Sequence, residues 1–219
     1  MPKLGILDAN THLAKANQLT SVQLNELFAL QKEHTPERYP ECTLSTVAYS
    51  IEDMTPALLT FAIDLVESNM SELYIRSKDG WCREDKEYEM QDIASRYLIA
   101  FHNDKPVGMV HFQFVDEETM TDRYAEVAYC FEIQVVPEYQ RRGIGAYLIS
   151  LLETIGKATQ MEKVMLTVFK ANKNAIKFYI DQMQYNYDEI SPCVCLTRGR
   201  ASRFDYEILS KPLQPAIRS

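Results

Sequence analysis

The chain has 219 residues, of which 46% are hydrophobic and 25% charged, and its formal net charge is −8. This composition is typical of a globular protein with one ample domain, and it excludes a disordered chain. A direct nucleic-acid binder usually carries the opposite charge balance, so no direct contact with nucleic acid is expected. The negative charge is compatible with a basic partner such as a cationic peptide, although solubility alone is the simpler explanation.

Residue usage also argues against metal-binding and membrane proteins. The five cysteines are an odd number without Cys-x-x-Cys spacing, which predicts free thiols in a reducing compartment. The four histidines show no ligand spacing, so no metal site is expected. No apolar run is long enough to span a bilayer, and the first residues lack the apolar core of a signal peptide. We therefore expect no membrane contact.

Hydrophobic periodicity divides the chain into a first helix and a longer α/β segment. Apolar residues at helical spacing over 13–34 predict an amphipathic helix that ends near Pro36 and covers its apolar stripe by packing on the core. Residues 1–40 are therefore interpreted as an N-terminal helical segment, 41–211 as the main domain and 212–219 as a frayed tail.

The order of elements in the main domain fits a mixed sheet. Strands are expected over 41–51, 96–102, 107–115, 124–136, 162–169, 185–190 and 204–209. Helices are expected to begin near Pro56, Arg83, Ile144 and Asn172, with an acidic loop over 116–122 and another loop over 193–203. This order predicts an α/β fold, with a mixed central sheet flanked by helices and an additional N-terminal helix.

A basic glycine turn joins the 124–136 strand to the helix that follows it. Gly143 and Gly145 carry no Cβ, so a ligand can approach the backbone closely. The first N–H groups of the helix lack intrahelical acceptors and favour an anion, and Arg141 and Arg142 add positive charge. The turn therefore suits a pyrophosphate. It lacks the third glycine of the dinucleotide fingerprint and the Gly-Lys-Ser/Thr of the Walker pattern, and an ordinary loop entering a helix is the alternative interpretation.

The glycine turn and several separated blocks resemble a known family. Gln140-Arg-Arg-Gly-Ile-Gly145 is similar to the Gln/Arg-x-x-Gly-x-Gly/Ala signature with which GNAT acetyltransferases grip coenzyme A, and the element order is that of the GNAT fold. The blocks 69–74, 80–81, 129–132, 165–170 and 206–210 resemble the NatD family, which acetylates the N-terminal α-amine of histone-four and histone-two-A tails. The resemblance covers roughly 55–210, whereas residues 1–50 match weakly and the family's basic N-terminal segment is missing.

This resemblance implies a set of cofactor contacts. Acetyl-CoA is expected as the co-substrate, without a metal. Its pantetheine arm is expected on the backbone of Ile133, Gln134 and Val135, at a strand end that Pro137 splays open. The remaining expected contacts are Arg141, Arg142, Gly143, Ile144, Gly145, Ala146 and Asn172. Asn172 is also interpreted as an ordinary helix N-cap, and both roles are compatible.

Two residues are candidates for proton transfer. Glu132 lies inside an otherwise apolar strand, where a carboxylate is costly unless it is paired, hydrated or used, and it is the candidate base. It shares strand parity with Glu126, so an exposed polar face is the alternative. Tyr179 occupies the position where many GNAT enzymes keep a tyrosine near the departing thiolate, and an aromatic core residue is the alternative. Cys130 has the same parity as Glu132, so a covalent intermediate stays open, although direct attack in a ternary complex is expected.

For the acceptor, the resemblance points to histone N-terminal tails that begin Ser-Gly-Arg-Gly. The implied peptide contacts are Tyr74, Tyr129, Phe131, Thr167 and Tyr206, and Trp81 is expected either to wall the groove or to anchor the core. Relatives often carry tyrosine where Phe131 stands. In the acidic loop, Asp116 or Glu118 is expected to meet the arginine of the tail, with a solvated loop as the alternative.

The resemblance leaves other activities open. A GNAT enzyme acting on lysine side chains or a small amine is the nearest alternative, and an acyl-CoA-binding module without turnover is a further one. For the main hypothesis, we expect a monomer located in the cytoplasm and nucleus.

Overall fold

The computed structural model describes residues 11–30, 32–36, 40–78 and 80–213. Its helices are α1 (His12–Asn17), α2 (Ser21–Leu27), α3 (Pro56–Ile75), α4 (Arg83–Met90), α5 (Ile144–Ala158), α6 (Lys173–Lys177), α7 (Pro192–Cys195) and α8 (Arg198–Ala201). The short turns η1 (Ile51–Asp53) and η2 (Pro137–Tyr139) are 3-10 helices, and η3 (Phe178–Gln182) is π-helical. The strands are β1 (Ser45–Ser50), β2 (Arg96–His102), β3 (Lys105–Glu118), β4 (Tyr124–Val135), β5 (Lys163–Phe169), β6 (Asn186–Tyr187) and β7 (Tyr206–Pro212).

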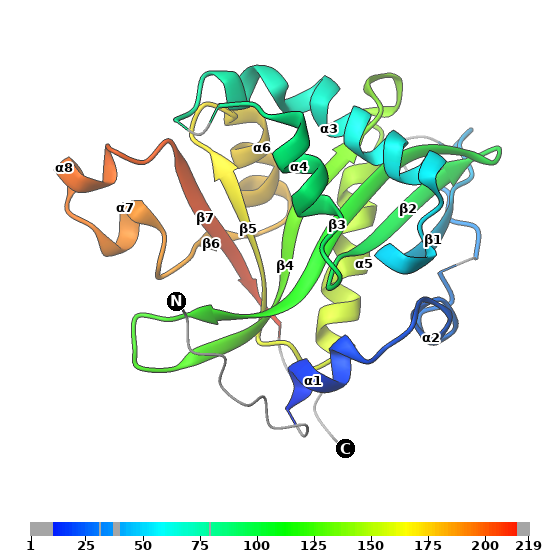
Figure 1. Ribbon diagram of the computed structural model, residues 1–219, viewed down its shortest axis with the longest axis horizontal. Coiled ribbons are helices and arrows are strands. Elements are labelled where there is room, and N and C mark those ends of the chain that lie inside the picture. The colour runs from blue at the N-terminus through cyan, green and yellow to red at the C-terminus, as the bar shows by residue number, and fades with distance from the viewer. Residues whose placement is uncertain (1–10, 31, 37–39, 79, 214–219) are drawn as a thin grey trace.

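The described strands form one mixed sheet. Their order is β1-β2-β3-β4-β5-β7-β6, and β4 and β5 are parallel while the other neighbours are antiparallel. The parallel pair is joined by α5, which is the crossover that a parallel connection requires. The glycine turn therefore follows the end of β4, which is the central strand of the sheet (Figure 1). The α/β fold predicted from the sequence is confirmed.

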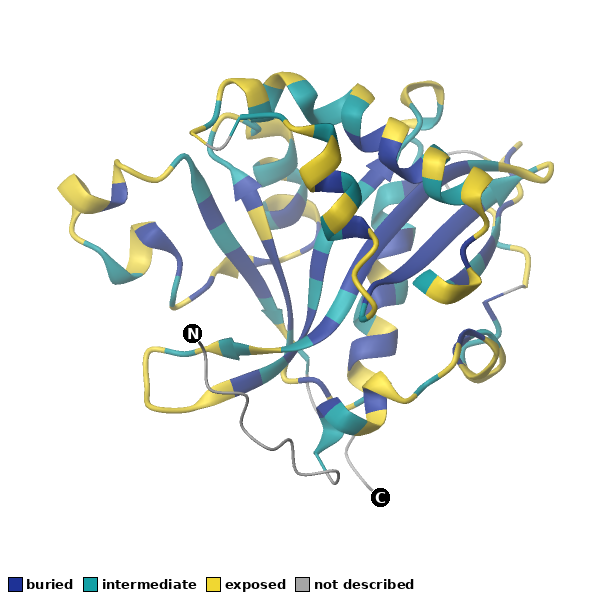
Figure 2. Cartoon of the chain, in the orientation of Figure 1, coloured by how far each residue is buried: buried dark blue, intermediate teal, exposed yellow. Residues whose placement is uncertain are grey.

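Helices cover both faces of this sheet. On one face, α1, α2 and α5 share a core cluster with β2, β3 and β4. On the other face, α3 and Met90 of α4 pack on β2 and β3. Figure 2 shows that buried residues concentrate in the central strands and along the inner side of α5. Among the described helices, none is both long and apolar enough to cross a membrane.

The N-terminal segment differs from the single helix predicted over 13–34. It forms α1 and α2, and each helix begins at a threonine N-cap. Thr20 and Gln23 form a reciprocal capping box, which starts a new helix where the apolar pattern alone suggests continuation. Leu13 and Leu24 are buried in the cluster beneath α5.

The C-terminal part is more irregular than its pattern predicts. The strand expected over 185–190 is only the two-residue β6, and the 193–203 loop contains α7 and α8. β7 continues to Pro212, which pairs with Lys163, so the frayed tail does not begin there. Residues 214–219 lie outside the described part of the chain.

Leu24 should contribute strongly to stability. Its side chain is 1% exposed, so Leu24→Ala removes core packing and should lower the free energy of unfolding by about 2–5 kcal/mol. Leu27, which ends the same helix and is 66% exposed, is the control. Leu27→Ala should change the free energy of unfolding by less than about 0.5 kcal/mol. Urea unfolding measures both values. Equal, small effects would show that α2 does not brace the core.

Candidate active site

The central strands β4 and β5 separate partway along their length. Their parallel pairing stops at Cys130 and Leu166. At this level Phe131 forms a β-bulge, an extra residue of β4 opposite β3. A bulge bends the strand that carries it. The strands therefore begin to separate well before Pro137, where the sequence pattern placed the opening.

The bulge also decides which face each β4 side chain occupies. Cys130 lies in the core cluster beneath α5. Glu132 instead contacts Tyr74 of α3 and Lys86 of α4, on the opposite face. The prediction that Cys130 and Glu132 share a face is wrong, because the extra residue reverses the alternation.

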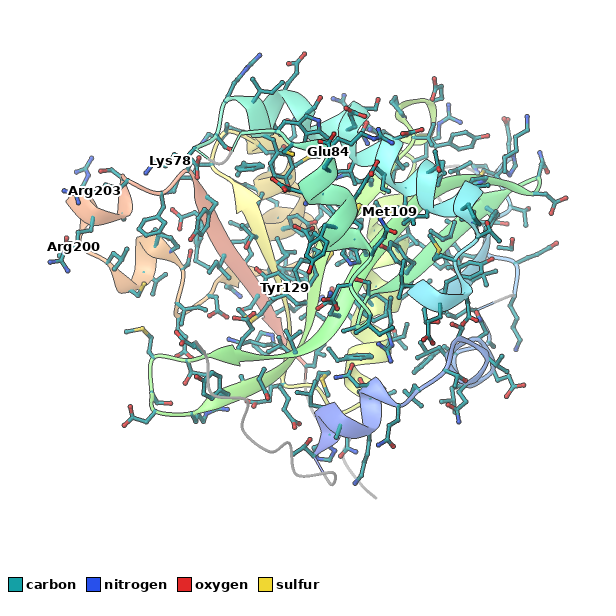
Figure 3. All side chains as sticks on the ribbon, in the orientation of Figure 1. Lys78, Glu84, Met109, Tyr129, Arg200 and Arg203 are labelled. Carbon is teal, nitrogen blue, oxygen red and sulfur yellow. The ribbon has the colours of Figure 1, made fainter. Side chains whose placement is uncertain are left out.

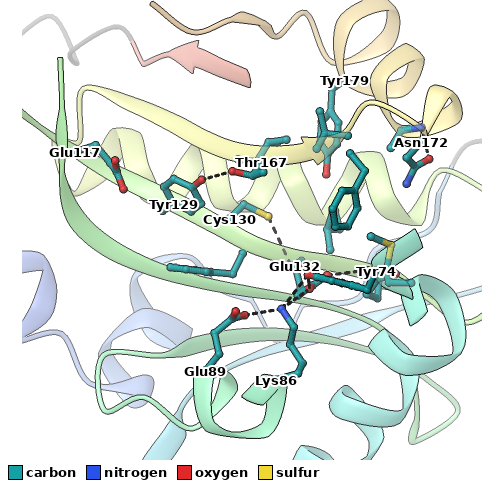
Figure 4. Close-up of a pocket in the computed structure, with 18 residues that line it drawn as sticks. Tyr74, Lys86, Glu89, Glu117, Tyr129, Cys130, Glu132, Thr167, Asn172 and Tyr179 are labelled. Carbon is teal, nitrogen blue, oxygen red and sulfur yellow. Dashed lines mark hydrogen bonds and ion pairs between the residues drawn. The ribbon is translucent and has the colours of Figure 1, made fainter. Parts of the chain in front are cut away.

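A cavity of about 430 Å³ opens where the two strands separate (Figure 4). The predicted site residues that line it are Tyr74, Tyr129, Phe131, Glu132, Ile133, Gln134, Thr167, Asn172 and Tyr179. The predicted residues that lie outside its lining are Trp81, Asp116, Glu118, Val135, Tyr206 and the glycine turn Arg141, Arg142, Gly143, Ile144, Gly145 and Ala146. Lys86, Glu89 and Glu117 line the cavity without having been predicted.

Glu132 is the centre of a buried polar network on the cavity wall. Its Oε1 accepts hydrogen bonds from the Tyr74 hydroxyl at 3.2 Å and from Lys86 Nζ at 3.1 Å. Its Oε2 accepts one from Gln134 Nε2 at 2.9 Å, and Asn69 Nδ2 in turn donates to Gln134 Oε1 at 3.0 Å. Glu132 is therefore paired and oriented, and is not part of an exposed polar face.

Lys86 is the charge partner of Glu132. It is 8% exposed, and Nζ also donates to Glu89 Oε1 at 2.8 Å and to the Tyr74 hydroxyl at 3.0 Å. Burial lowers the pKa of Lys86, but the negative charges around it, Glu132 first, outweigh burial and hold the pKa above its ordinary value. Burial and then Glu132 raise the pKa of Tyr74. At neutral pH the network therefore holds an ammonium and a neutral phenol.

Tyr179 and Cys130 lie on the α5 side of the opening. Burial, then Cys130 and Glu132, raise the pKa of Tyr179 well above its ordinary value, so it carries a proton at neutral pH. Burial and then Glu132 likewise raise the pKa of Cys130. A buried thiol with a raised pKa is a poor nucleophile.

His111 lies behind the bulge. Its ring stacks on Phe131 at 5.2 Å between centroids and on Tyr97 at 5.0 Å. Burial and then Lys86 lower the pKa of His111 to about 3. It is therefore neutral at working pH and supports Phe131 by packing.

The acidic residues differ from the loop predicted over 116–122. Asp116, Glu117 and Glu118 belong to β3, where successive side chains alternate between faces. Glu117 lines the cavity, and its two neighbours do not. Burial raises the pKa of Glu117. Asp116 and Glu118, which were expected to meet the arginine of a tail, therefore lie outside the cavity lining, and Glu117 lies inside it.

The aromatic residues form a continuous wall. The Tyr74 ring meets Phe169 edge-on at 4.9 Å and lies 5.4 Å from Trp81. Trp81 donates from Nε1 to Glu67 at 3.2 Å, so it supports Tyr74 from outside the cavity lining. Across the opening, the Tyr129 hydroxyl and the Thr167 hydroxyl are 2.6 Å apart.

Simple spacing rules contain signals for the residues that were missed. Lys86 and Met90 are four residues apart on α4 and are both buried, so they share its inner face. Glu117 has the parity of His111, which lies opposite Glu132 across β3 and β4. Neither rule states that the buried lysine meets the buried glutamate, because that contact joins distant segments.

Comparison with known proteins identifies the family. A model of the acetyltransferase (GNAT) family matches residues 63–183, more than half of the 219 residues. The chain belongs to the GNAT acetyltransferase family.

Solved GNAT-fold structures share this architecture. NAA60 of Arabidopsis thaliana, in complex with a bisubstrate analogue, is 16% identical with a TM-score of 0.56 over 78% of this chain and 100% of its own. The ribosomal-protein-S18-alanine N-acetyltransferase of Escherichia coli is 21% identical, with a TM-score of 0.51 over 78% and 96%. The PaiA N-acetyltransferase of Thermoplasma acidophilum, in complex with coenzyme A, is 18% identical, with a TM-score of 0.53 over 77% and 98%. At these identities the similarity shows the fold alone.

GNAT acetyltransferases use acetyl-CoA, and the described residues fit it. Gly143 caps α5 in a left-handed conformation with φ 89° and no side-chain cap hydrogen bond, so no capping side chain competes for the first N–H groups of this 15-residue helix, which suit an anion. Gly145 leaves space, since an added Cβ would approach nothing closer than Phe178 at 3.8 Å. Beyond Cys130, β4 pairs only with β3 among the described strands, which leaves its other edge for an extended arm.

Two further details concern the donor site. Asn172 Oδ1 accepts the Ala175 N–H at 3.1 Å, so Asn172 is the N-cap of α6 and also lines the cavity. The Arg142 guanidinium lies over the Tyr139 ring at 5.6 Å, beside the turn. In the described part of the chain, no group of three or more His, Cys, Asp or Glu residues could hold a metal ion.

Proposed function

We propose that this GNAT acetyltransferase moves the acetyl group of acetyl-CoA to the N-terminal α-amine of histone tails that begin Ser-Gly-Arg-Gly. The observation that carries this proposal is the cavity between β4 and β5, which holds Glu132 beside the open strand edge and Glu117 farther along. The NatD-like blocks Tyr74, Tyr129–Glu132 and Thr167 lie together on its walls. We further propose a monomer acting in the cytoplasm and nucleus.

In this proposal, Glu132 accepts the proton that the amine loses. A carboxylate has about four acceptor positions, and the described contacts of Glu132 use two on Oε1 and one on Oε2. The remaining position on Oε2 takes the amine proton, directly or through a water molecule. An α-amine has a pKa of about 8, compared with about 10.4 for lysine, so a carboxylate already paired with Lys86 is a sufficient base.

Tyr179 donates a proton to the departing thiolate. It lines the cavity on the side opposite Glu132 (Figure 4), and its raised pKa keeps the phenol protonated until the thiolate forms. Acetyl-CoA supplies a thioester carbonyl that is open to attack by the amine. Cys130 takes no part, because its thiol is buried and protonated, which supports direct attack in a ternary complex.

Glu117 recognises the arginine at the third position of the tail. It is half-buried and lines the cavity, and the charge of Lys163 acts on it without a salt bridge, because Lys163 Nζ pairs with Asp188, so a guanidinium would provide its direct charge partner. Glu117→Gln should raise KM about 10-fold for a Ser-Gly-Arg-Gly peptide and much less for a Ser-Gly-Ala-Gly peptide. Steady-state kinetics with both peptides measures this difference. Equal changes for the two peptides would place the arginine elsewhere, and Glu118→Gln on the other face is the matched control.

The acceptor amine is identified by mass spectrometry of an acetylated peptide. A peptide that carries both a free N-terminus and a lysine should receive its acetyl group at the N-terminus. Acetylation at lysine would favour the lysine-directed alternative and contradict the proposal.

A further inference from the structure

A second hollow of about 620 Å³ lies at the edge of the sheet next to the cavity. Lys78, from the loop after α3, lines it together with Arg200 and Arg203 around α8. Figure 3 shows these three side chains at the same edge of the molecule. Phe204 and Tyr206 supply its aromatic surface.

The two segments that form this hollow are tied together. The Lys78 backbone N–H donates to Asp205 Oδ2 at 2.8 Å, and Lys78 Nζ donates to the carbonyl of Arg203. Lys170, which directly follows β5, also binds the segment that contains Arg203. Its Nζ donates to the Ala201 carbonyl at 2.8 Å and to the Phe204 carbonyl at 2.9 Å. These hydrogen bonds fix the two segments that form the hollow relative to each other.

Its charge is opposite to that of the whole chain. Arg200 and Arg203 are exposed, and neither side chain forms a salt bridge with a described residue. Among the described residues of the lining, Asp205 is the acidic one, and one of its oxygens already accepts the Lys78 N–H. A protein with net charge −8 thus presents a cationic hollow with an aromatic wall.

The hollow continues the acceptor side of the cavity. Tyr206 pairs across the sheet with Phe169, and Phe169 lines the cavity beside Tyr74. The Phe204 ring meets Tyr206 edge-on at 5.5 Å, which extends the aromatic wall into the hollow. A polypeptide that leaves the cavity over Phe169 and Tyr206 therefore passes Lys78, Arg200 and Arg203.

We propose that this hollow is a second acceptor subsite, which binds an anionic side chain of the acceptor polypeptide several residues after the acetylated amine. This inference rests on the proposed function and deepens it. Guanidinium groups pair with carboxylate and phosphate alike, so the anion is either an acidic residue or a phosphorylated one. Preferred acceptors then combine an early arginine, at Glu117, with a later negative charge.

A peptide series tests the subsite. Each peptide begins Ser-Gly-Arg-Gly, followed by neutral residues and a pair of Glu, Gln or phosphoserine residues at one of three spacings. In the unmodified enzyme at low salt, KM at the best spacing should be about 5- to 10-fold lower for the Glu peptide than for the Gln peptide. The double variant Arg200→Gln/Arg203→Gln should reduce this ratio to less than about 2-fold without changing kcat.

Arg198→Gln is the matched control, because Arg198 is exposed on α8 but does not line the hollow. The Arg198→Gln variant should keep the full 5- to 10-fold difference in KM between the Gln and Glu peptides. A gain with phosphoserine but not with Glu would still support the subsite and identify phosphate as the anion. Identical KM values for the Glu, Gln and phosphoserine peptides at every spacing, or a ratio that survives the double variant, would overturn the proposal. Arginine-dependent binding of a single-stranded oligonucleotide without any peptide effect would overturn it too.

Equilibrium binding separates this proposal from the proposed function. The same Glu, Gln and phosphoserine peptides with an acetylated N-terminus cannot be acceptors at that amine, but they still reach the hollow. Suppose that no peptide turns over, but the acetylated Glu peptide binds more tightly than the acetylated Gln peptide, and the double variant loses this difference. The subsite then stands and the proposed function fails. Equal binding of the acetylated Glu, Gln and phosphoserine peptides would remove the subsite whatever the turnover.

Discussion

Glu132→Gln should lower kcat by about 10²- to 10⁴-fold, the range expected for losing a general base. The amide keeps the shape of the side chain and can still contact Tyr74 and Lys86, but it cannot take the amine proton. Since a free α-amine has a pKa of about 8, the variant should recover part of its rate as the pH rises from 7 to 9. Initial-rate kinetics across that range, with saturating acetyl-CoA, measures both effects.

Glu126→Gln is the control for this experiment. Glu126 lies on the same strand and is half-buried, but it precedes the bulge and is outside the cavity lining. Its variant should keep full activity. The KM for acetyl-CoA should be unchanged in both variants. A kcat for Glu132→Gln within about 3-fold of the unmodified enzyme would show that Glu132 is structural and that the proton leaves by another route.

Lys86→Met should destabilise the folded protein by about 3–5 kcal/mol at pH 8, because it leaves the Glu132 charge buried without its partner. Methionine replaces the lysine side chain as far as Cε and lacks only the ammonium group, so most of this loss reflects charge. The double variant Lys86→Met/Glu132→Gln should recover part of the stability, since it leaves no uncompensated buried charge, and Glu89, the other partner of Lys86, is partly exposed. Urea unfolding of the two variants and the unmodified protein measures these differences.

The pH dependence gives this prediction a definite sign. The pKa of Lys86 is raised in the folded state, so its stabilising contribution is complete below its unfolded value of about 10.4 and is lost only as the pH rises beyond that. Between pH 5 and 8 the Lys86 contribution is therefore constant. Lys177→Met, at an exposed position, is the control. A loss below about 1 kcal/mol at pH 8 would contradict the role given to Lys86.

Local patterns were sufficient to predict most of the fold. The strand, glycine turn and helix around Gly143 were predicted because each carries a strong local signal: alternation, missing Cβ atoms and helical spacing. The same holds for β2, whose bounds match the predicted strand. The break between α1 and α2 was missed because the capping box at Thr20 is a few polar contacts inside a long apolar pattern.

The site was harder to predict because its geometry depends on tertiary contacts. One extra residue, Phe131, places Cys130 and Glu132 on opposite faces of the strand. No residue type at this position predicts a bulge. Lys86 was missed because α4 consists mostly of charged residues, a pattern that predicts a solvent-exposed helix. The acidic residues 116–118 were placed in a loop, so alternation was not applied to them, and Asp116 and Glu118 were chosen in place of Glu117. The basic hollow combines the loop at Lys78 with α8, two segments more than a hundred residues apart.

The most direct test of the central claim is thiol release from acetyl-CoA with three peptides. One begins Ser-Gly-Arg-Gly with a free amine, the second is the same peptide with that amine acetylated beforehand, and the third begins Met-Asp with a free amine. We predict turnover with the first peptide alone. Equal turnover with the first two peptides would place the acceptor on a side chain and contradict an N-terminal α-amine acetyltransferase that reads the early arginine.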